Sequence, residues 1–225
     1  MVKRDSNKKN KFLKHKLLPI VAGTILLVAG TVGVVKRVIP QGEKVISVID
    51  GDSFKIGNDQ TIRFLSMDAP DVKYCMGKEA KEILTKKIQG KKVILKELKT
   101  DRYGRVMAMI YTEGGENVNE LMIKNGLAIH LWDNTKELKI LGEASDYARE
   151  QRLGIFSPEC YQTEPPKKGC NIKGSINQTT KEKTYTMPNC DRYALTVIEK
   201  YKGENWYCTE KEAQKDGFVK SKNCK

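Results

Sequence analysis

Residues 17–35 contain no charged side chain and are mostly apolar. As a helix, a run of this length would rise about 28 Å at about 1.5 Å per residue, close to the hydrocarbon thickness of a bilayer. Residues 1–16 are strongly basic, and Lys36 and Arg37 follow the apolar run. Because most of the basic residues precede the run, we expect the N-terminus in the cytoplasm and the chain beyond residue 40 outside the membrane.

Two interpretations of this segment differ in whether it is retained. Its length suits a single-pass membrane anchor, whereas the small residues between Ala29 and Gly33 would suit a cleaved signal peptide. No A-x-A site is present and the run is long for a signal peptide, which favours the anchor. The expected location is therefore the cell membrane, with the remainder outside, or secretion if the segment is cleaved.

The net charge of +13 is unevenly distributed. Residues 1–40 hold nine basic residues and one acid, so +8 of the charge lies there, and 32 basic against 27 acidic residues remain beyond them. This mild positive balance is compatible with a polyanionic partner such as nucleic acid, and equally with an ordinary solvated surface.

Short strands dominate the pattern after residue 43. The strands that we expect, including one short extended run, cover residues 44–50, 53–57, 61–67, 91–98, 105–112 and 127–132. Helical spacing of apolar residues covers residues 77–90, 118–126 and 135–154. About five strands with helices inserted between them predict a mainly β fold, a small antiparallel five-stranded barrel of the OB type.

Composition divides the chain into four parts. They are a basic tail and span (1–40), the barrel domain (41–160), a polar linker with paired prolines (161–169) and a small module (170–225). The module holds four cysteines and few aliphatic residues, so cross-links or a metal should stabilise it. All six cysteines follow the span, and export favours disulfides, with a four-cysteine zinc site as the alternative.

Histidine chemistry has little support in this sequence. His15 lies in the basic tail and His130 on an expected strand, and no Ser/His/Asp arrangement, Walker loop or dinucleotide fingerprint is present. Any chemistry must therefore come from carboxylates, arginines and a hard cation.

Such residues gather at the ends of the expected strands: Asp50, Asp52, Arg63, Asp68, Asp71 and Arg105. Strand alternation places Arg63, Leu65 and Met67 on one face. Two carboxylates at adjoining strand ends suit Ca2+, and two arginines suit a phosphodiester. DGDS is also an ordinary turn sequence, and Asp/Arg pairs are often surface ion pairs, so spacing alone leaves catalysis open.

Five ordered motifs carry a family resemblance: VIDGDS, IRFLSMDAPD, GKEA, TDRYGRVMAMIY and VNELMIKNGLA. In this order the chain resembles staphylococcal nuclease-like proteins from about Val45 to about Phe156. The resemblance implies an OB-barrel enzyme that cuts DNA and RNA with Ca2+ and leaves 3′-phosphate ends.

The same resemblance assigns roles to individual residues. It implies that Asp52 and Asp68 bind the metal together with the backbone carbonyl of Ala69. It implies that Arg63 and Arg105 bind the scissile phosphate. Three further residues match positions at the bound nucleotide: Arg102, Tyr103 and Trp132.

Two departures concern the segment after Pro70. Asp71 stands where the family typically has the glutamate that serves as base or water-positioning group, and the loop to Gly77 is shorter than in the staphylococcal enzyme. Exported relatives often carry a cysteine in this loop and another after the last helix, which implies a Cys75–Cys160 disulfide. By pattern we predict Cys170–Cys208 and Cys190–Cys224 in the module. The module resembles a short tail found on some bacterial nuclease-like proteins, and part of it also resembles zinc-binding modules of the Ada type.

The sequence therefore predicts a Ca2+-dependent phosphodiesterase that acts outside the membrane on DNA, RNA or both. We infer no protein partner and expect a monomer. One alternative is a catalytically weak or inactive OB-fold protein that binds nucleic acid at the envelope, disabled at Asp71, and another is a structural envelope protein. The joint presence of the metal carboxylates and arginines favours the enzyme, because a pure binder needs no metal carboxylates.

Overall fold

The computed structural model describes residues 42–224, all of which fall within one compact unit. The expected basic tail and membrane anchor (1–40) lie outside the described residues. Across residues 42–224, none of the helices combines the length and the apolar character that crossing a membrane requires.

Five strands close a barrel in the order β1-β2-β3-β6-β5. Their bounds are Glu43–Val48 (β1), Ser53–Ile56 (β2), Thr61–Phe64 (β3), Lys92–Thr100 (β5) and Val106–Thr112 (β6). The expected five-stranded barrel is thus confirmed, but it is not wholly antiparallel, because β3 and β6 pair in parallel. A parallel pair needs a long connection, because the chain must return to the end of the barrel where the first strand began. Here the connection between β3 and β6 contains a helix and β5.

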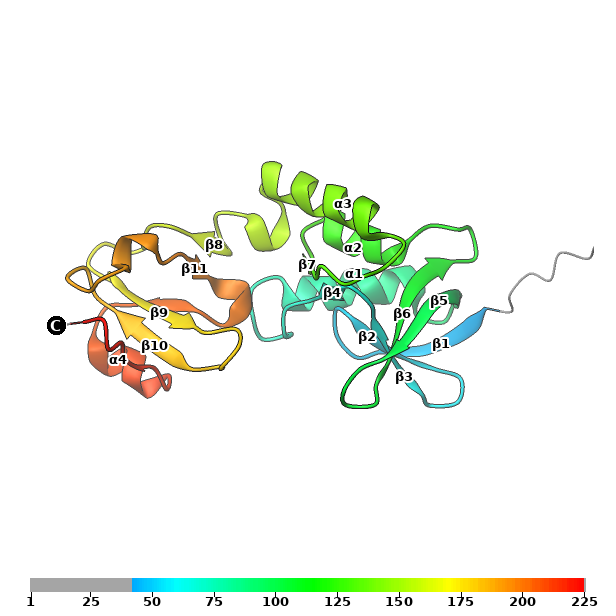
Figure 1. Cartoon of the computed structure of the whole chain (residues 1–225), viewed down its shortest axis with the longest axis horizontal. Helices are drawn as coiled ribbons and strands as arrows, with labels where there is room; N and C mark the ends of the chain where they lie inside the picture. Colours follow the sequence, from blue (N-terminus) through cyan, green and yellow to red (C-terminus); the bar gives the residue numbers. More distant parts are fainter. Residues whose placement is uncertain (1–41, 225) are drawn as a thin grey trace, which may run out of the picture. The chain divides into compact units, whose positions relative to one another are not determined.

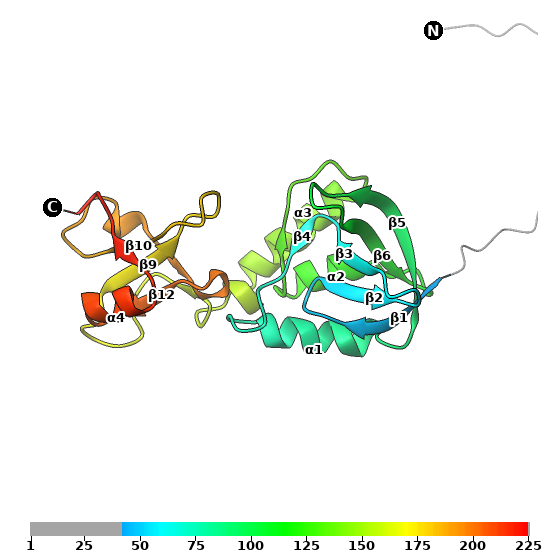
Figure 2. The same cartoon turned by 90° about the horizontal axis from the view of Figure 1, so that it is seen from below.

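Three helices accompany the barrel: α1 (Gly77–Ile88), α2 (Val118–Lys124) and α3 (Leu138–Glu150). α1 lies along the barrel beside β1 (Figure 2), and α2 and α3 lie next to each other (Figure 1). Ala80, Leu84 and Ile88 bury the inner face of α1, whereas Ile83, which helical spacing also assigned to that face, is 39% exposed. Gly90 ends the α1 segment as predicted, with a φ of 75°.

The expected strand 61–67 is wrong in its second half. β3 ends at Phe64, Ser66 has a φ of 61°, and a short strand β4 (Met67–Asp68) pairs instead with β7 (Ile129–His130). The side-chain amide of Asn119 donates to the Leu65 carbonyl oxygen, which holds this turn inside the fold. Leu65 and Met67 are consequently buried and do not share a face with Arg63.

The C-terminal module is built on a four-stranded sheet in the order β12-β9-β10-β13 (Figure 2). Its strands and single α-helix are β9 (Ile172–Ile176), β10 (Lys183–Thr186), β12 (Asn205–Tyr207), β13 (Val219–Lys220) and α4 (Glu210–Lys215). Short 3-10 helices cover Gly154–Phe156 (η1), Tyr193–Leu195 (η2) and Lys200–Lys202 (η3). The small core between sheet and helix centres on Tyr185, Tyr207 and Phe218.

Three disulfides hold the chain: Cys75–Cys160, Cys170–Cys208 and Cys190–Cys224. They join the pairs that the sequence analysis proposed. Because every cysteine is disulfide-bonded, the module has no thiolate for the alternative zinc site.

The module also contacts the barrel domain directly. Within the expected linker, β8 (Tyr161–Gln162) pairs with β11 (Ile198–Glu199) of the module. Tyr201 of η3 packs with Ala148 and Phe156 at the end of the barrel domain, beside Ile129 of β7. The segment that composition marked as a linker therefore begins as a strand joined to the module.

Candidate active site

The DGDS turn places a carboxylate inside the fold. A Cβ atom on Gly51 would lie 2.7 Å from the Cβ of Ala69 and 2.8 Å from that of Ala80. Only glycine therefore allows the turn to pack this closely against α1 and the Asp68–Ala69 segment. As a result Asp52, the next residue, is 2% exposed.

Asp52, Arg63 and Asp68 form a continuous hydrogen-bonded cluster. Nη1 of Arg63 donates to Oδ1 of Asp52 at 2.6 Å, and Nη2 donates to Oδ1 of Asp68. The Ala69 N–H donates to the other Asp52 oxygen at 2.8 Å. The structure thus brings together the two proposed metal carboxylates, the residue proposed to supply a carbonyl, and one proposed phosphate-binding arginine.

The cluster is electrostatically unbalanced. Burial raises the pKa of Asp52 to about 7, the charge of Arg63 acts against this rise, and Asp50 and Asp68 add to it. Asp71 adds a fourth carboxylate to the neighbourhood, since it lines one groove with Asp68. Two carboxylates contact the one guanidinium of Arg63, with Asp50 and Asp71 in the neighbourhood, so a phosphodiester anion could approach only with further positive charge.

Asp71 is held by a tight turn. The Tyr74 N–H donates to the Asp71 carbonyl at 2.8 Å, and a Cβ on Gly77 would lie 2.0 Å from that same oxygen. The shortened loop is therefore compact, and Cys75 within it is tied to Cys160. The Asp71 carboxylate itself is 56% exposed; Lys73 is its partner, through a long ion pair of 3.6 Å and a backbone N–H that donates at 3.3 Å.

Arg105 is oriented by its own loop. Nε of Arg105 donates to Oδ2 of Asp101 at 2.7 Å, while Oδ1 accepts the N–H groups of Tyr103 and Arg105. Although burial acts to raise it, these hydrogen bonds keep the pKa of Asp101 below its ordinary value. Arg63 is paired with Met107 across the parallel strands, so Arg105, two residues earlier, lies on the same face as Arg63.

The proposed nucleotide-binding residues lie on two different loops. The guanidinium carbons of Arg102 and Arg105 lie 4.8 Å and 5.5 Å from the ring centroid of Tyr103, which is 69% exposed. Trp132 follows β7, is 72% exposed, and has its ring centroid 4.5 Å from that of His130. Two exposed aromatic rings are therefore available for stacking with bases.

Sequence reasoning missed two residues that position the site. Asp101 orients Arg105, and its position before a Tyr103–Gly104 turn is a typical place for an aspartate that caps a turn. Asn119 is fully buried, accepts from the Ile110 N–H and donates to the Leu65 carbonyl. No local pattern marks a helical asparagine for such a role, because its partners lie up to 54 residues away.

Sequence reasoning also missed the contribution of the C-terminal module. The groove beside Asp68 and Asp71 encloses about 160 Å³ and is lined in part by Gln178, Tyr201 and Lys202. These residues lie more than 100 positions beyond the aspartates. The module therefore borders the candidate site.

The donor atoms of the cluster suit a hard cation. In residues 42–224, no three carboxylates, thiols or imidazoles converge into a metal cage of their own. Asp52 and Asp68 provide two carboxylates on either side of Arg63, and Asp68 is half-exposed. Since Ca2+ accepts carboxylate, carbonyl, water and substrate oxygens, two protein carboxylates with an open side are compatible with it.

A small closed barrel that carries carboxylates and oriented arginines on one face suits attack on a phosphodiester, the chemistry of a nuclease. Residues 61–158 match the family model described as staphylococcal nuclease homologue. Residues 61–158 are thus similar to this family, and the match together with the relatives supports a nuclease, a hydrolase of phosphodiester bonds, as the class of the protein.

Curated relatives agree with this assignment. The chain is 29% identical over 117 residues to an uncharacterized endonuclease of Escherichia coli, covering 51% of this chain and 76% of that protein. It is 31% identical over 137 residues to an SPbeta prophage-derived endonuclease of Bacillus subtilis and 33% identical over 122 residues to a staphylococcal-like nuclease of Arabidopsis thaliana. Each of these two matches covers 54% of this chain, but only 46% and 36% of the respective relative.

Proposed function

We propose that this protein is a Ca2+-dependent endonuclease that hydrolyses DNA, RNA or both outside the membrane and leaves 3′-phosphate ends. The observation that carries the proposal is the Asp52–Arg63–Asp68 cluster, with Asp71 in the adjoining groove. The relatives named as endonucleases and the family match support the reaction class.

The need for a cation follows from the charge of the site. The carboxylates at the site outnumber the one guanidinium that pairs with them and disfavour the approach of a phosphodiester, so a divalent cation would serve to reverse the local potential. Asp52, Asp68 and the Ala69 carbonyl would hold it. When bound, Ca2+ would polarise the phosphate and position a water molecule.

The two arginines stabilise the charge that develops on the phosphate. Arg63 is held between two carboxylates and Arg105 against Asp101, so neither guanidinium has to be ordered from a free state. Both lie on the same face of the β3–β6 pair. Arginine donors of this kind match the oxygens of a phosphate pairwise, and their fixed orientation favours the transition state.

Asp71 orients or deprotonates the attacking water. Its carboxylate is exposed to the groove side of the cluster and has only a weak partner in Lys73. The carboxylate is one methylene shorter than the glutamate typical of the family, while the tight turn to Gly77 fixes its backbone. We therefore propose a working enzyme that is slower than one with glutamate at this position.

The test is cleavage of plasmid DNA and of RNA by the full chain, with Ca2+ and with excess chelator. We expect activity with Ca2+ only, and a loss of roughly 10²–10³ in rate for Asp52→Asn and for Arg105→Ala. Asp59→Asn is the matched control, because Asp59 is an exposed turn aspartate paired with Lys55. Full activity in chelator would refute the cation, and wild-type rates in both variants would refute the site.

Two finer parts of the proposal have their own measurements. Sensitivity of the product ends to a 3′-phosphatase distinguishes 3′-phosphate from 3′-hydroxyl ends. Membrane fractionation and protease accessibility in whole cells test whether the barrel domain lies outside the membrane. If the wild type binds DNA or RNA but cleaves neither with Ca2+ present, the protein is a nucleic-acid-binding protein without nuclease activity.

A further inference from the structure

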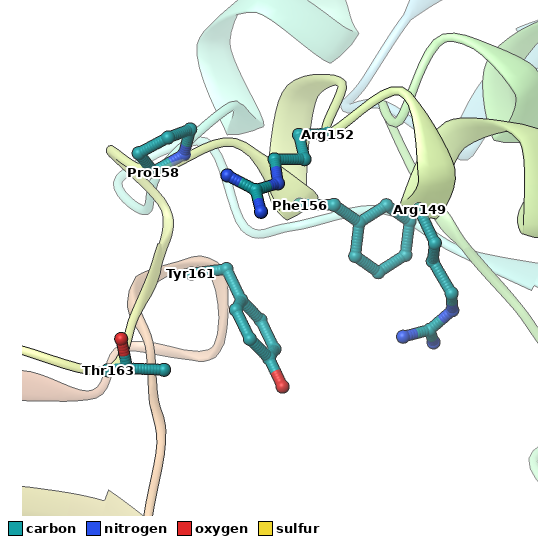
Figure 3. A pocket seen from close by; sticks show the side chains of 6 residues that line it. All are labelled: Arg149, Arg152, Phe156, Pro158, Tyr161 and Thr163. Atoms are coloured by element: carbon teal, nitrogen blue, oxygen red, sulfur yellow. The ribbon is translucent and has the colours of Figure 1, made fainter.

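A second concave site lies where α3 ends and β8 begins. It encloses about 420 Å³, a volume within the usual range for small-ligand pockets. The residues that line this α3–β8 pocket are Arg149, Arg152, Phe156, Pro158, Tyr161 and Thr163 (Figure 3). None of them belongs to the candidate active site.

The two arginines of this pocket are uncompensated. Arg63 and Arg105 each pair with aspartates, whereas across residues 42–224 neither Arg149 nor Arg152 forms an ion pair with a carboxylate. The guanidinium carbon of Arg149 lies 4.3 Å from the Phe156 ring centroid, which orients that side chain. Two guanidinium groups without carboxylate partners on one pocket provide a site for an anion such as phosphate.

Aromatic rings complete the pocket. Figure 3 shows the Phe156 ring between the side chains of Arg149 and Tyr161. Phe156 is buried and forms part of the wall, whereas Tyr161 is 37% exposed and offers its ring to a ligand. Arginines next to an exposed aromatic ring are the features with which proteins bind single-stranded nucleic acid, phosphate on the arginines and base on the ring.

This pocket is joined to the active site through a thin wall of side chains. Phe156 packs with Tyr201 and Ile129. Both of these also line the groove beside Asp71, and Ile129 is the strand partner of Asp68. Tyr201 and Ile129 thus line the groove on one side and pack against Phe156, which lines the pocket, on the other.

We propose that the α3–β8 pocket is an accessory binding site for one nucleotide of a single-stranded substrate, distinct from the nucleotide at the cleavage site. Arg149 and Arg152, on either side of the Phe156 ring, bind backbone phosphates next to this nucleotide, and Tyr161 stacks on its base. This inference rests on the proposed nuclease function. The pocket contributes affinity for strands long enough to reach it and takes no part in bond cleavage.

The experiment is a binding titration with a fluorescent single-stranded oligonucleotide of about ten nucleotides, within the usual footprint of such proteins. A cleavage-resistant phosphorothioate backbone keeps the oligonucleotide intact with Ca2+ present, and the full chain is used, so the basic residues 1–16 contribute equally to every variant. The test variants are Arg149→Gln with Arg152→Gln, and Tyr161→Leu. The control is Lys211→Gln with Lys215→Gln, which removes the same charge from exposed positions of α4.

We expect the arginine pair to weaken binding at least tenfold and to reduce the salt dependence, because one or two phosphate contacts are lost. Tyr161→Leu should weaken binding about five- to a hundredfold through lost stacking. The lysine control should change affinity less than threefold, and a dinucleotide, which is too short to occupy the cleavage site and the pocket at once, should show a much smaller difference between the variants. Thermal unfolding of each variant shows whether the fold is kept.

Each other outcome has a definite reading. Equal losses in the arginine and lysine variants would mean that only overall charge matters, and unchanged binding in the arginine variant would exclude the pocket; either result overturns the inference. If the wild type cleaves with Ca2+ but the arginine variant binds like the wild type, the accessory site is refuted and the proposed nuclease function stands. If the wild type never cleaves but binding depends on the arginines, the nuclease proposal fails while the pocket stands as a nucleic-acid site.

Discussion

The Cys75–Cys160 disulfide should provide a large share of the stability of this domain. It closes an interval of 85 residues, and both other disulfides lie outside that interval. In the chain-entropy treatment, a loop of this length restricts the unfolded state by about 4.5 kcal/mol. Replacing both cysteines with alanine should therefore lower the melting temperature by roughly 10–18 °C, at about 2–4 °C per kcal/mol for a chain of this size.

The assay is reversible denaturant unfolding under oxidising conditions, with thiol titration to show that the other bridges remain. The comparison variant removes Cys190–Cys224, which closes 34 residues and interlocks with Cys170–Cys208. Because Cys170–Cys208 still constrains about half of that loop, removal of Cys190–Cys224 should cost less than removal of Cys75–Cys160. If the Cys75/Cys160 variant unfolds with the wild-type free energy, within the extrapolation error of about 10–15%, the loop-closure reasoning is wrong.

The remaining predictions concern single residues. Asn119→Ala should cost about 2–4 kcal/mol in denaturant unfolding, because it leaves two buried backbone groups without partners. Gly126→Ala should cost more than 3 kcal/mol, since the residue has a φ of 65° and the new Cβ would lie 2.2 Å from a backbone carbonyl oxygen; a small loss would show that the turn can open. Asp101→Asn keeps the turn acceptor but removes the charge that orients Arg105, so kcat/KM should fall about tenfold with unfolding nearly unchanged, as activity and stability measured side by side will show. Asp71→Asn should slow cleavage further and Asp71→Glu should leave it equal or faster; a wild-type rate in the Asn variant would remove Asp71 from the reaction.

Much of the barrel could be predicted because its signals are local. The short apolar runs and the turn at 57–59 mark β2 and β3, and the stripe of Ala80, Leu84 and Ile88 marks α1. The break after Phe64 could not be predicted in this way. It depends on the side chain of Asn119, which lies on α2, 54 residues further along the chain.

The site was predictable to the extent that a resemblance supplied it. Spacing alone left the Asp/Arg set indistinguishable from surface ion pairs, whereas the ordered motifs selected the residues that the structure brings into one cluster. The contribution of Tyr201 and Lys202 to the groove had no sequence signal. Contacts of this kind depend on how the β8–β11 pair and the Tyr201 cluster dock the module, which are tertiary interactions.

The arginines of this chain fall into two electrostatic classes, and the difference predicts what each class does. Arg63 and Arg105 pair with aspartates that also fix their orientation, so under the proposed mechanism they would add little attraction for a distant phosphate and would act where charge develops in the transition state. Arg149 and Arg152 carry charge without such partners and can attract a strand in its ground state. Interactions that are stronger in the transition state act on kcat, and interactions of equal strength in both states act on KM. Loss of Arg105 should therefore appear in kcat on substrates of every length, and loss of the pocket arginines should appear in KM on long substrates only.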